Sequence, residues 1–190
     1  NDVDALLALG ADCCCYLGDG IGPRAIGAVE EMSRFLRAGT NVVSTSLNQL
    51  VYPKTAAEEL RGPLEAACRE GATSFFNNGA DPGFGSDLIP LTLLSLMDDL
   101  ESVRVQEIVN YRDYDQAWVM RDLFGFGMPL DHVAPLFTSG ALTEYWGGVV
   151  TLVADALGIT LDEIRETHDV AAIDRDVEVA IGTITAGSVA

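Results

Sequence analysis

The chain has 190 residues, of which 48% are hydrophobic, so it can bury a substantial core in one large domain or two small ones. Its formal net charge of -18 argues against nucleic-acid binding, which depends on lysine and arginine side chains that neutralise phosphates. Apolar stretches fall short of the ~20 residues that cross a bilayer, and the acidic start of the chain is unlike a signal peptide. We therefore expect an acidic, cytoplasmic globular protein without a nucleic-acid or membrane partner.

The cysteines predict neither a metal site nor a disulfide framework. Cys13, Cys14 and Cys15 are consecutive, so they lack the C-x-x-C spacing of metal ligands, and neighbouring strand residues point to opposite faces. We interpret them as small buried strand residues. Cys68 stands alone, which favours a reducing compartment and no disulfide.

Strands and helices alternate through the first half of the chain, a pattern that favours a parallel, doubly wound sheet. Apolar residues at helical spacing and short apolar runs predict, in order, a helix over Val3–Leu9, a strand over Asp12–Leu17, a helix over Pro23–Ala38, a strand over Asn41–Ser46, a helix over Ala56–Glu70 that stops at Gly71, and a strand over Thr73–Asn78.

The second half has a different order of elements. The sequence predicts helices over Ser86–Leu100, Gln116–Phe124, Leu142–Leu157 and Leu161–Glu166, and strands over Val103–Tyr111 and Val177–Val189, the latter with Gly182 as a possible bulge. We expect an α/β fold in which residues 1–84 form the C-terminal half of a Rossmann-type parallel sheet, followed by an α+β substrate or oligomerisation domain over residues 85–190.

A glycine-rich loop, Gly18-Asp-Gly20-Ile-Gly22-Pro23, connects the first expected strand to the next helix. It departs from the dinucleotide fingerprint G-x-G-x-x-G because Pro23 stands where the third glycine belongs, and no acidic residue ends the following strand. We interpret it as a later βα loop that lines a cofactor cleft. A true pyrophosphate loop and an ordinary flexible turn are the alternatives.

Three segments carry a family resemblance. The run Asn77-Asn-Gly-Ala-Asp-Pro-Gly-Phe-Gly-Ser-Asp-Leu-Ile-Pro-Leu91 resembles the G-x-N-P-G-F … D-L-L-P-L segment of the dihydrodipicolinate reductase-like superfamily, particularly its 2,4-diaminopentanoate dehydrogenase and native amine dehydrogenase branch. Asn41–Pro53 and Val103–Arg112 resemble the strands on either side of it. The resemblance implies an internal piece of such a protein, whose first βαβ unit lies upstream and whose last strands lie downstream.

The resemblance also implies a binding site for NAD or NADP, bordered by the loops after three strands. The nicotinamide ring is expected near Asn78 and Phe84, because glycines let backbone amides approach a flat ring and an aromatic side chain can cover it. The expected cofactor-binding residues are Gly18, Thr45, Ser46, Asn78, Gly79, Pro82, Gly83 and Phe84. The alternative is that Asp81-Pro82-Gly83 is only a turn into a helix.

The chemistry depends on a departure from the family pattern. The amine-forming branch implies a glutamate within the loop Leu47–Tyr52, where this chain has Asn48 and Gln49, and neither amide can accept a proton. Asp81 replaces a common asparagine, and a partly buried carboxylate there could take part in proton transfer or simply close its turn. The remaining candidates for lining a substrate pocket are Asn48, Tyr52, Asn110 and His132.

Together these features predict an NAD(P)-dependent oxidoreductase that moves hydride between nicotinamide and a small carbonyl, imine or amine substrate. A homo-oligomer is expected. The alternative is a catalytically altered nucleotide-binding or oligomerisation module on the same scaffold.

Overall fold

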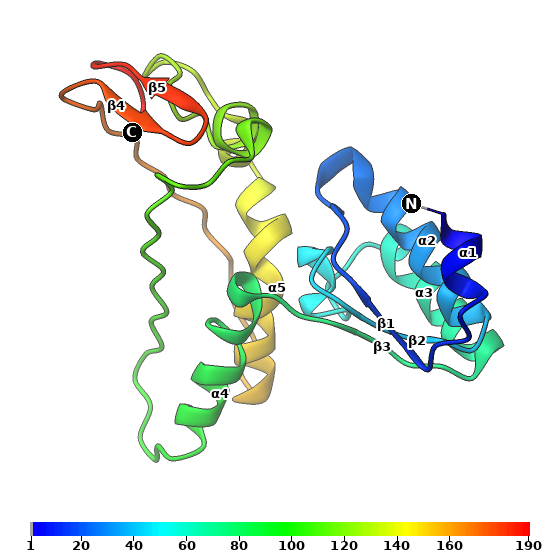
Figure 1. The fold of residues 1–190 in the computed structure, drawn as a ribbon. Coiled ribbons are helices and arrows are strands. Elements are labelled where there is room, and N and C mark those ends of the chain that lie inside the picture. Colours follow the sequence, from blue (N-terminus) through cyan, green and yellow to red (C-terminus); the bar gives the residue numbers. More distant parts are fainter. Residues whose placement is uncertain (1) are drawn as a thin grey trace. The chain divides into compact units, whose positions relative to one another are not determined.

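A computed structural model of the chain describes residues 2–190. The chain forms two compact units, drawn in Figure 1. The first contains the described residues up to Val105 together with Tyr145–Asp162, and the second contains Gln106–Glu144 and Glu163–Ala190.

The first unit is built on a parallel sheet of three strands in the order β1-β2-β3. The strands are β1 (Cys13–Tyr16), β2 (Asn41–Ser44) and β3 (Phe75–Asn77), and Cys14 pairs with Val42, which pairs with Phe75. The predicted α/β class and parallel sheet are confirmed, and the arrangement is consistent with part of a Rossmann-like fold.

Helices α1 (Val3–Leu7), α2 (Ala25–Arg37) and α3 (Glu58–Gly71) lie on one side of this sheet (Figure 1). Met32 and Leu36 of α2 are completely buried, and they belong to one hydrophobic core with Val42 of the sheet and Leu64 of α3. The predicted helix over Pro23–Ala38 is confirmed, since a 3-10 turn, η1 (Gly22–Arg24), leads directly into α2. The core therefore lies between the sheet and its helical layer.

No element of the described chain covers the opposite face of the sheet. Its side chains include Cys15, Val43 and Phe76, of which Val43 is 42% and Phe76 is 59% exposed. Cys13 and Cys15 are exposed and Cys14 is half-buried, so the prediction of three buried cysteines is wrong. The reason is that β1 is an edge strand of a sheet with helices on only one face.

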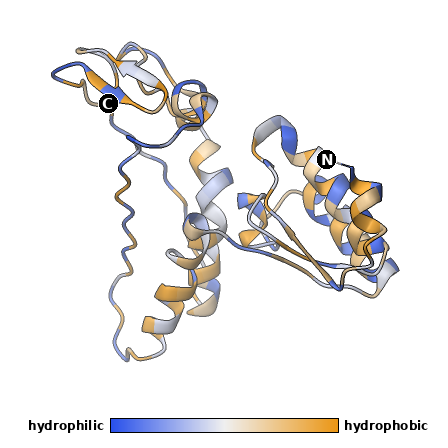
Figure 2. Ribbon diagram, in the orientation of Figure 1, coloured by the Kyte–Doolittle hydropathy of each residue, from blue (hydrophilic) through white to orange (hydrophobic). Residues whose placement is uncertain are grey.

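The rest of the first unit consists of short turns and two further helices. A 3-10 turn, η2 (Asn48–Val51), follows β2, and η3 (Ala80–Phe84) follows β3. Helix α4 (Leu88–Leu94) comes next, and α5 (Ala141–Ala156) starts in the second unit and runs into the first. Figure 2 colours α4 and much of α5 as hydrophobic.

The second unit contains a π-helical segment, η4 (Trp118–Leu123), a 3-10 turn, η5 (Pro135–Phe137), and an antiparallel pair, β4 (Val177–Val179) and β5 (Gly182–Ile184). The ring of Tyr111 contacts Phe124 edge-on, with centroids 5.3 Å apart. The predicted strand over Val177–Val189 is therefore a hairpin followed by a turn. Gly182 starts the second strand with a φ of +112°, a conformation that favours glycine.

Other predicted elements also differ from the structure. Val103–Tyr111 has no strand pairing, because the described chain offers it no neighbouring strand, and its residues are exposed except for the half-buried Tyr111. The helix expected over Ser86–Leu100 is only seven residues long and starts after Asp87, whose carboxylate accepts a hydrogen bond from the Leu88 amide. The helix over Ala56–Glu70 continues through Gly71, and Ala72 takes the left-handed conformation at its end.

The helix predicted over Leu161–Glu166 does not form, and a tertiary contact provides the reason. The Glu166 carboxylate accepts hydrogen bonds from the backbone amides of Gly140 (2.8 Å) and Thr143 (2.6 Å) at the start of α5. The side-chain hydrogen bond with Thr143, followed by the backbone bonds from Gly140 and Thr143, holds the pKa of Glu166 below its usual range. The carboxylate thus satisfies helix amides that would otherwise lack a partner.

We expect Leu36→Ala to lower the free energy of unfolding by about 2–5 kcal/mol, because the truncation leaves a cavity in the fully buried core. Ile26→Ala, in the same helix at a side chain that is 49% exposed, is the matched control and should change it by less than about 0.5 kcal/mol. Urea unfolding of both variants measures the difference. Equal losses would contradict the placement of α2 on the sheet.

Candidate functional site

The carboxyl ends of the three parallel strands meet at one edge of the sheet, where hydrogen bonds join the following loops. The Ser44 carbonyl accepts from the Asn78 amide at 3.0 Å, and the Ser44 hydroxyl accepts from the Ser46 amide at 2.9 Å. The Ser46 hydroxyl donates to the Tyr16 carbonyl at 3.4 Å. In open α/β sheets this edge is where ligands bind, so the structure assembles a candidate site here.

Asn77 fixes the spacing between two of these loops, and sequence reasoning missed it. The side chain is 6% exposed; its Nδ2 donates to the Leu47 carbonyl at 2.7 Å, and its Oδ1 accepts from the Leu47 amide at 3.4 Å. A buried polar residue at the last position of an apolar strand is the only signal that could have revealed it. Both halves of one amide therefore anchor the loop that follows β2.

Two glycines of the loops are required by close packing. A Cβ on Gly20 would lie 2.4 Å from the Ser46 carbonyl oxygen. A Cβ on Gly83, whose φ is +143°, would lie 2.2 Å from Oδ1 of Asn78. The glycine-rich loop after β1 thus has at least one structural role, namely contact with the loop after β2.

Asp81 lies in the loop η3 with one carboxylate oxygen satisfied and the other not. Its Oδ2 accepts a hydrogen bond from Nε1 of Trp146, on α5, at 3.4 Å. Its Oδ1 is buried and has no hydrogen-bond partner in the described chain. A buried carboxylate oxygen without a donor is costly, so it marks a position where a hydrogen-bond donor of a ligand would be stabilised.

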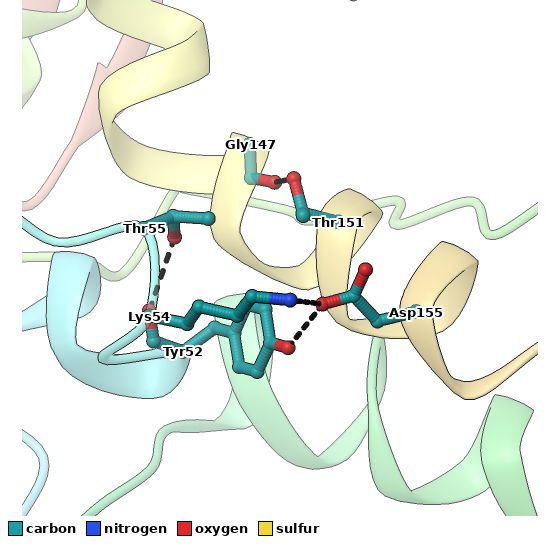
Figure 3. Close-up of polar contacts among 6 residues, drawn as sticks. All are labelled: Tyr52, Lys54, Thr55, Gly147, Thr151 and Asp155. Carbon is teal, nitrogen blue, oxygen red and sulfur yellow. Dashed lines mark hydrogen bonds and ion pairs between the residues drawn. The ribbon is translucent and has the colours of Figure 1, made fainter. Parts of the chain in front are cut away.

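A second polar cluster joins the loop after β2 to α5 (Figure 3). The Tyr52 hydroxyl and the Lys54 ammonium both donate to Oδ2 of Asp155, each at 2.5 Å. Gly148 of α5 lies close to this loop, since a Cβ there would be in ordinary van der Waals contact with Cβ of Tyr52, at 3.5 Å. We call Tyr52, Lys54 and Asp155 the α5 carboxylate cluster.

The three groups of the α5 carboxylate cluster shift one another's pKa. The hydrogen bonds from Lys54 and Tyr52 lower the pKa of Asp155. The hydrogen bond to Asp155 raises the pKa of Tyr52 and, likewise, that of Lys54. The carboxylate therefore stays ionised and the phenol and ammonium stay protonated across the neutral range.

The expected cofactor-binding residues lie together along the loops of the sheet edge. Ser46, Pro82 and Gly83 are buried, Asn78 and Gly79 are half-buried, and Gly18, Thr45 and Phe84 are exposed. The Phe84 ring is 53% exposed, so its surface is open to a planar group. Their role in cofactor binding stays a prediction.

The expected substrate-lining residues are divided between the two units. Asn48 and Tyr52 are half-buried and lie in the first unit. Asn110 and His132 are exposed and lie in the second, where Oδ1 of Asn110 accepts a hydrogen bond from the Arg112 amide at 3.0 Å. The structure thus brings the first two, but not the last two, into the unit that contains Asp81.

Metal binding finds no support in residues 2–190, which contain no group of three or more His, Cys, Asp or Glu side chains arranged to hold an ion. Over the same residues, no helix is long and apolar enough to span a membrane.

We expect Asn77→Ala to lower the free energy of unfolding by about 1–3 kcal/mol, because both backbone groups of Leu47 lose their side-chain partner. Thr45→Ala, at an exposed neighbouring position, should change it by less than about 0.5 kcal/mol. Urea unfolding compares the two variants. A neutral Asn77→Ala would show that the loop after β2 does not depend on this amide.

The α5 carboxylate cluster predicts a pH-dependent contribution to stability. The lowered pKa of Asp155 makes this contribution fully present above the ordinary carboxyl pKa and lost as the pH falls below about 4. The raised pKa of Lys54 makes the contribution to stability present below the ordinary lysine pKa and lost as the pH rises above about 10. Unfolding midpoints of the parent and Asp155→Asn should therefore differ at neutral pH and converge at both extremes. A pH-independent difference would contradict the assignment.

Sequence similarity relates most of this chain to a known protein. No family model matches the chain. The chain is 39% identical over 177 residues to a protein of Streptomyces virginiae named amine dehydrogenase. The match covers 93% of this chain and 49% of the relative, so the chain spans about half the length of the protein it resembles. This similarity supports an amine dehydrogenase-like relationship.

Proposed function

We propose that this chain is part of an NAD(P)-dependent oxidoreductase that moves hydride between a nicotinamide ring and a small amine, imine or carbonyl substrate. The similarity to an amine dehydrogenase supports the oxidoreductase class. The observation that carries the proposal is the unpartnered Oδ1 of Asp81, buried in a loop at the carboxyl edge of a parallel sheet.

The residues at this edge fit a dinucleotide. Ser46, Asn78, Gly79 and Gly83 would hold it through hydroxyl, amide and backbone groups, and Phe84 would cover the ring with its exposed face. Gly18, Thr45 and Pro82 would complete the contacts of the three loops. A bound nicotinamide supplies or accepts the hydride in reactions of this class. Either NAD or NADP satisfies these contacts.

Asp81 would exchange a proton with the nitrogen of the substrate. Trp146 occupies Oδ2, which leaves Oδ1 for an N–H or O–H group of the substrate. In the oxidation of an amine, Oδ1 accepts a proton from the substrate nitrogen; in the reverse direction it returns that proton. Because proton exchange in this position needs a carboxylate, the amides Asn48 and Gln49 cannot replace it.

The charge of the chain also favours amines. With 29 acidic and 11 basic residues, the protein attracts cations and repels anions over the range of the screened field. Protonated amines are small cations at neutral pH. The charge of the chain therefore favours the approach of an amine substrate.

A second candidate is a nucleotide-binding or oligomerisation module without catalysis. Asn48 and Gln49 favour it, because they occupy the loop where the amine-forming family implies a glutamate. The two candidates differ in one respect, since only the first requires a carboxylate that exchanges protons with the substrate.

We expect Asp81→Asn in the full-length protein to lower kcat by about 10²- to 10⁴-fold with the affinity for NADH or NADPH unchanged, because the variant loses the proton acceptor and keeps the shape of the side chain. Turnover assays with a panel of small amines and ketones measure kcat, and fluorescence titration measures cofactor binding. Asp98→Asn, at an exposed carboxylate, is the matched control and should keep the parental values.

Three outcomes separate the candidates. Unchanged turnover in Asp81→Asn removes Asp81 from the mechanism. A parent protein that binds the cofactor but turns over no substrate favours the module. A full-length parent that binds neither NADH nor NADPH contradicts the oxidoreductase and the nucleotide-binding module, and leaves an oligomerisation module.

A further inference from the structure

The α5 carboxylate cluster contains an ammonium group that the chain itself supplies. Lys54 is the single lysine of the sequence, and its Nζ lies 2.5 Å from Oδ2 of Asp155. The same oxygen accepts the Tyr52 hydroxyl (Figure 3). The structure therefore shows how a carboxylate beside a phenol holds an N–H-donating cation at this position.

Both acceptors in the cluster are suited to such a cation. Asp155 is an ionised carboxylate with one oxygen used by Tyr52 and Lys54, and its side chain is 33% exposed. Tyr52 donates its own proton to Asp155, so its hydroxyl oxygen keeps lone pairs that can accept an N–H group. A charge-assisted bond to the carboxylate and a neutral bond to the phenol would together select an ammonium over a neutral amine.

The ion pair between Lys54 and Asp155 is weak. Its side chain is 67% exposed, and exposed ion pairs contribute little because water screens them and a long side chain loses rotamer freedom. A free cation of the same chemistry can therefore compete with Lys54 for Asp155 without disturbing the core.

The position of the cluster connects it to the candidate site. Tyr52 follows directly on η2, the loop in which the amide side chains Asn48 and Gln49 stand, and Asp155 brings a carboxylate to that loop from α5. Trp146, which donates to Asp81, belongs to the same helix. Nine residues along a helix correspond to roughly 13 Å, so the cluster is a separate place from Asp81.

We propose that Asp155 and Tyr52 form a binding subsite for an N–H-donating ammonium cation, and that Lys54 fills this subsite when the cation is absent. The cation is either the free ammonium ion or a small primary alkylammonium. The use of this subsite by the enzyme rests on the proposed function, since an amine dehydrogenase consumes a primary amine and releases ammonia. The binding itself requires neither cofactor nor turnover.

The side chain of Lys54 reports directly on the subsite, and its signal can be assigned with a variant. In NMR spectra of the full-length protein labelled with ¹³C- and ¹⁵N-lysine, the side-chain resonance that is lost in Lys54→Arg belongs to Lys54, and its position reports the ion pair with Asp155. Titration with ammonium chloride and, separately, with propylammonium chloride should move this resonance saturably to the position of a free lysine. At saturation, the pKa of Lys54 should fall toward its ordinary value.

Matched compounds and variants control the titration. Tetramethylammonium chloride has the same charge and no N–H, and propan-1-ol has the shape of propylammonium and no charge; neither should move the resonance at equal concentration. In Asp155→Asn, the Lys54 resonance should start at the free position and respond to no cation. In Glu70→Gln, which removes the carboxylate of the exposed pair Arg37–Glu70, the response should match the parent.

Each result has a defined meaning. A response to ammonium but not to propylammonium assigns the subsite to the free ion, and the reverse assigns it to an alkylammonium. An equal shift with tetramethylammonium would mean salt screening alone and would overturn the proposal, as would the absence of any shift. Failure of the proposed function appears separately, as a lack of cofactor binding or turnover while the Lys54 shift persists.

Kinetic measurements test whether the subsite of Asp155 and Tyr52 binds the amine substrate during the reaction. In the full-length enzyme, Asp155→Asn should raise KM for an amine at least tenfold with kcat nearly unchanged, whereas Lys54→Met should lower KM several-fold by removing the internal competitor. Glu70→Gln should leave both constants as in the parent. A fall in kcat with unchanged KM in Asp155→Asn would overturn a binding role.

Discussion

The parallel register of β1, β2 and β3 is the constraint on which the candidate site depends. Parallel pairing places the carboxyl ends of all three strands at one edge, so the loops after them must meet there. The buried side chains of Ser44, Ser46 and Asn77 then replace water as partners for the loop backbone. Without that register, Asp81 and the loop after β2 would have no common location.

Asp81, which accepts a hydrogen bond from Trp146 of α5, and Asp155, which belongs to α5, have different surroundings. Asp81 has a buried oxygen without a donor, as the proposed transfer of a proton to or from a bound substrate requires. Asp155 is partly exposed and accepts hydrogen bonds from Tyr52 and Lys54, as the proposed binding of a cation requires. Helix α5 thus contacts the first proposed group through Trp146 and supplies the second.

The two faces of the sheet differ in what covers them. One face packs on α2 and α3 and contains the core around Met32, Leu36 and Val42. The other presents Cys15, Val43 and Phe76, and no element of the described residues packs on it. Because parallel sheets are normally covered on both faces, this apolar face is the part of the unit that further protein surface would most stabilise.

The sequence by itself determined the α/β class, the alternation of strands and helices up to Asn78, and helices α2 and α5, because apolar spacing along the chain records which local face is buried. It also singled out Asp81 and Tyr52 as candidate site residues, and their roles stay predictions. Only the tertiary structure decided that Val103–Tyr111 lacks strand pairing, that Leu161–Glu166 is not helical, and that Asp155 lies beside Tyr52. A strand forms only where a neighbouring strand pairs with its backbone groups. The Glu166 carboxylate accepts hydrogen bonds from amides more than twenty residues away, and the Asp155 carboxylate accepts one from Tyr52, about a hundred residues away. Such contacts depend on where the chain folds back on itself, and no local pattern of residue types encodes that.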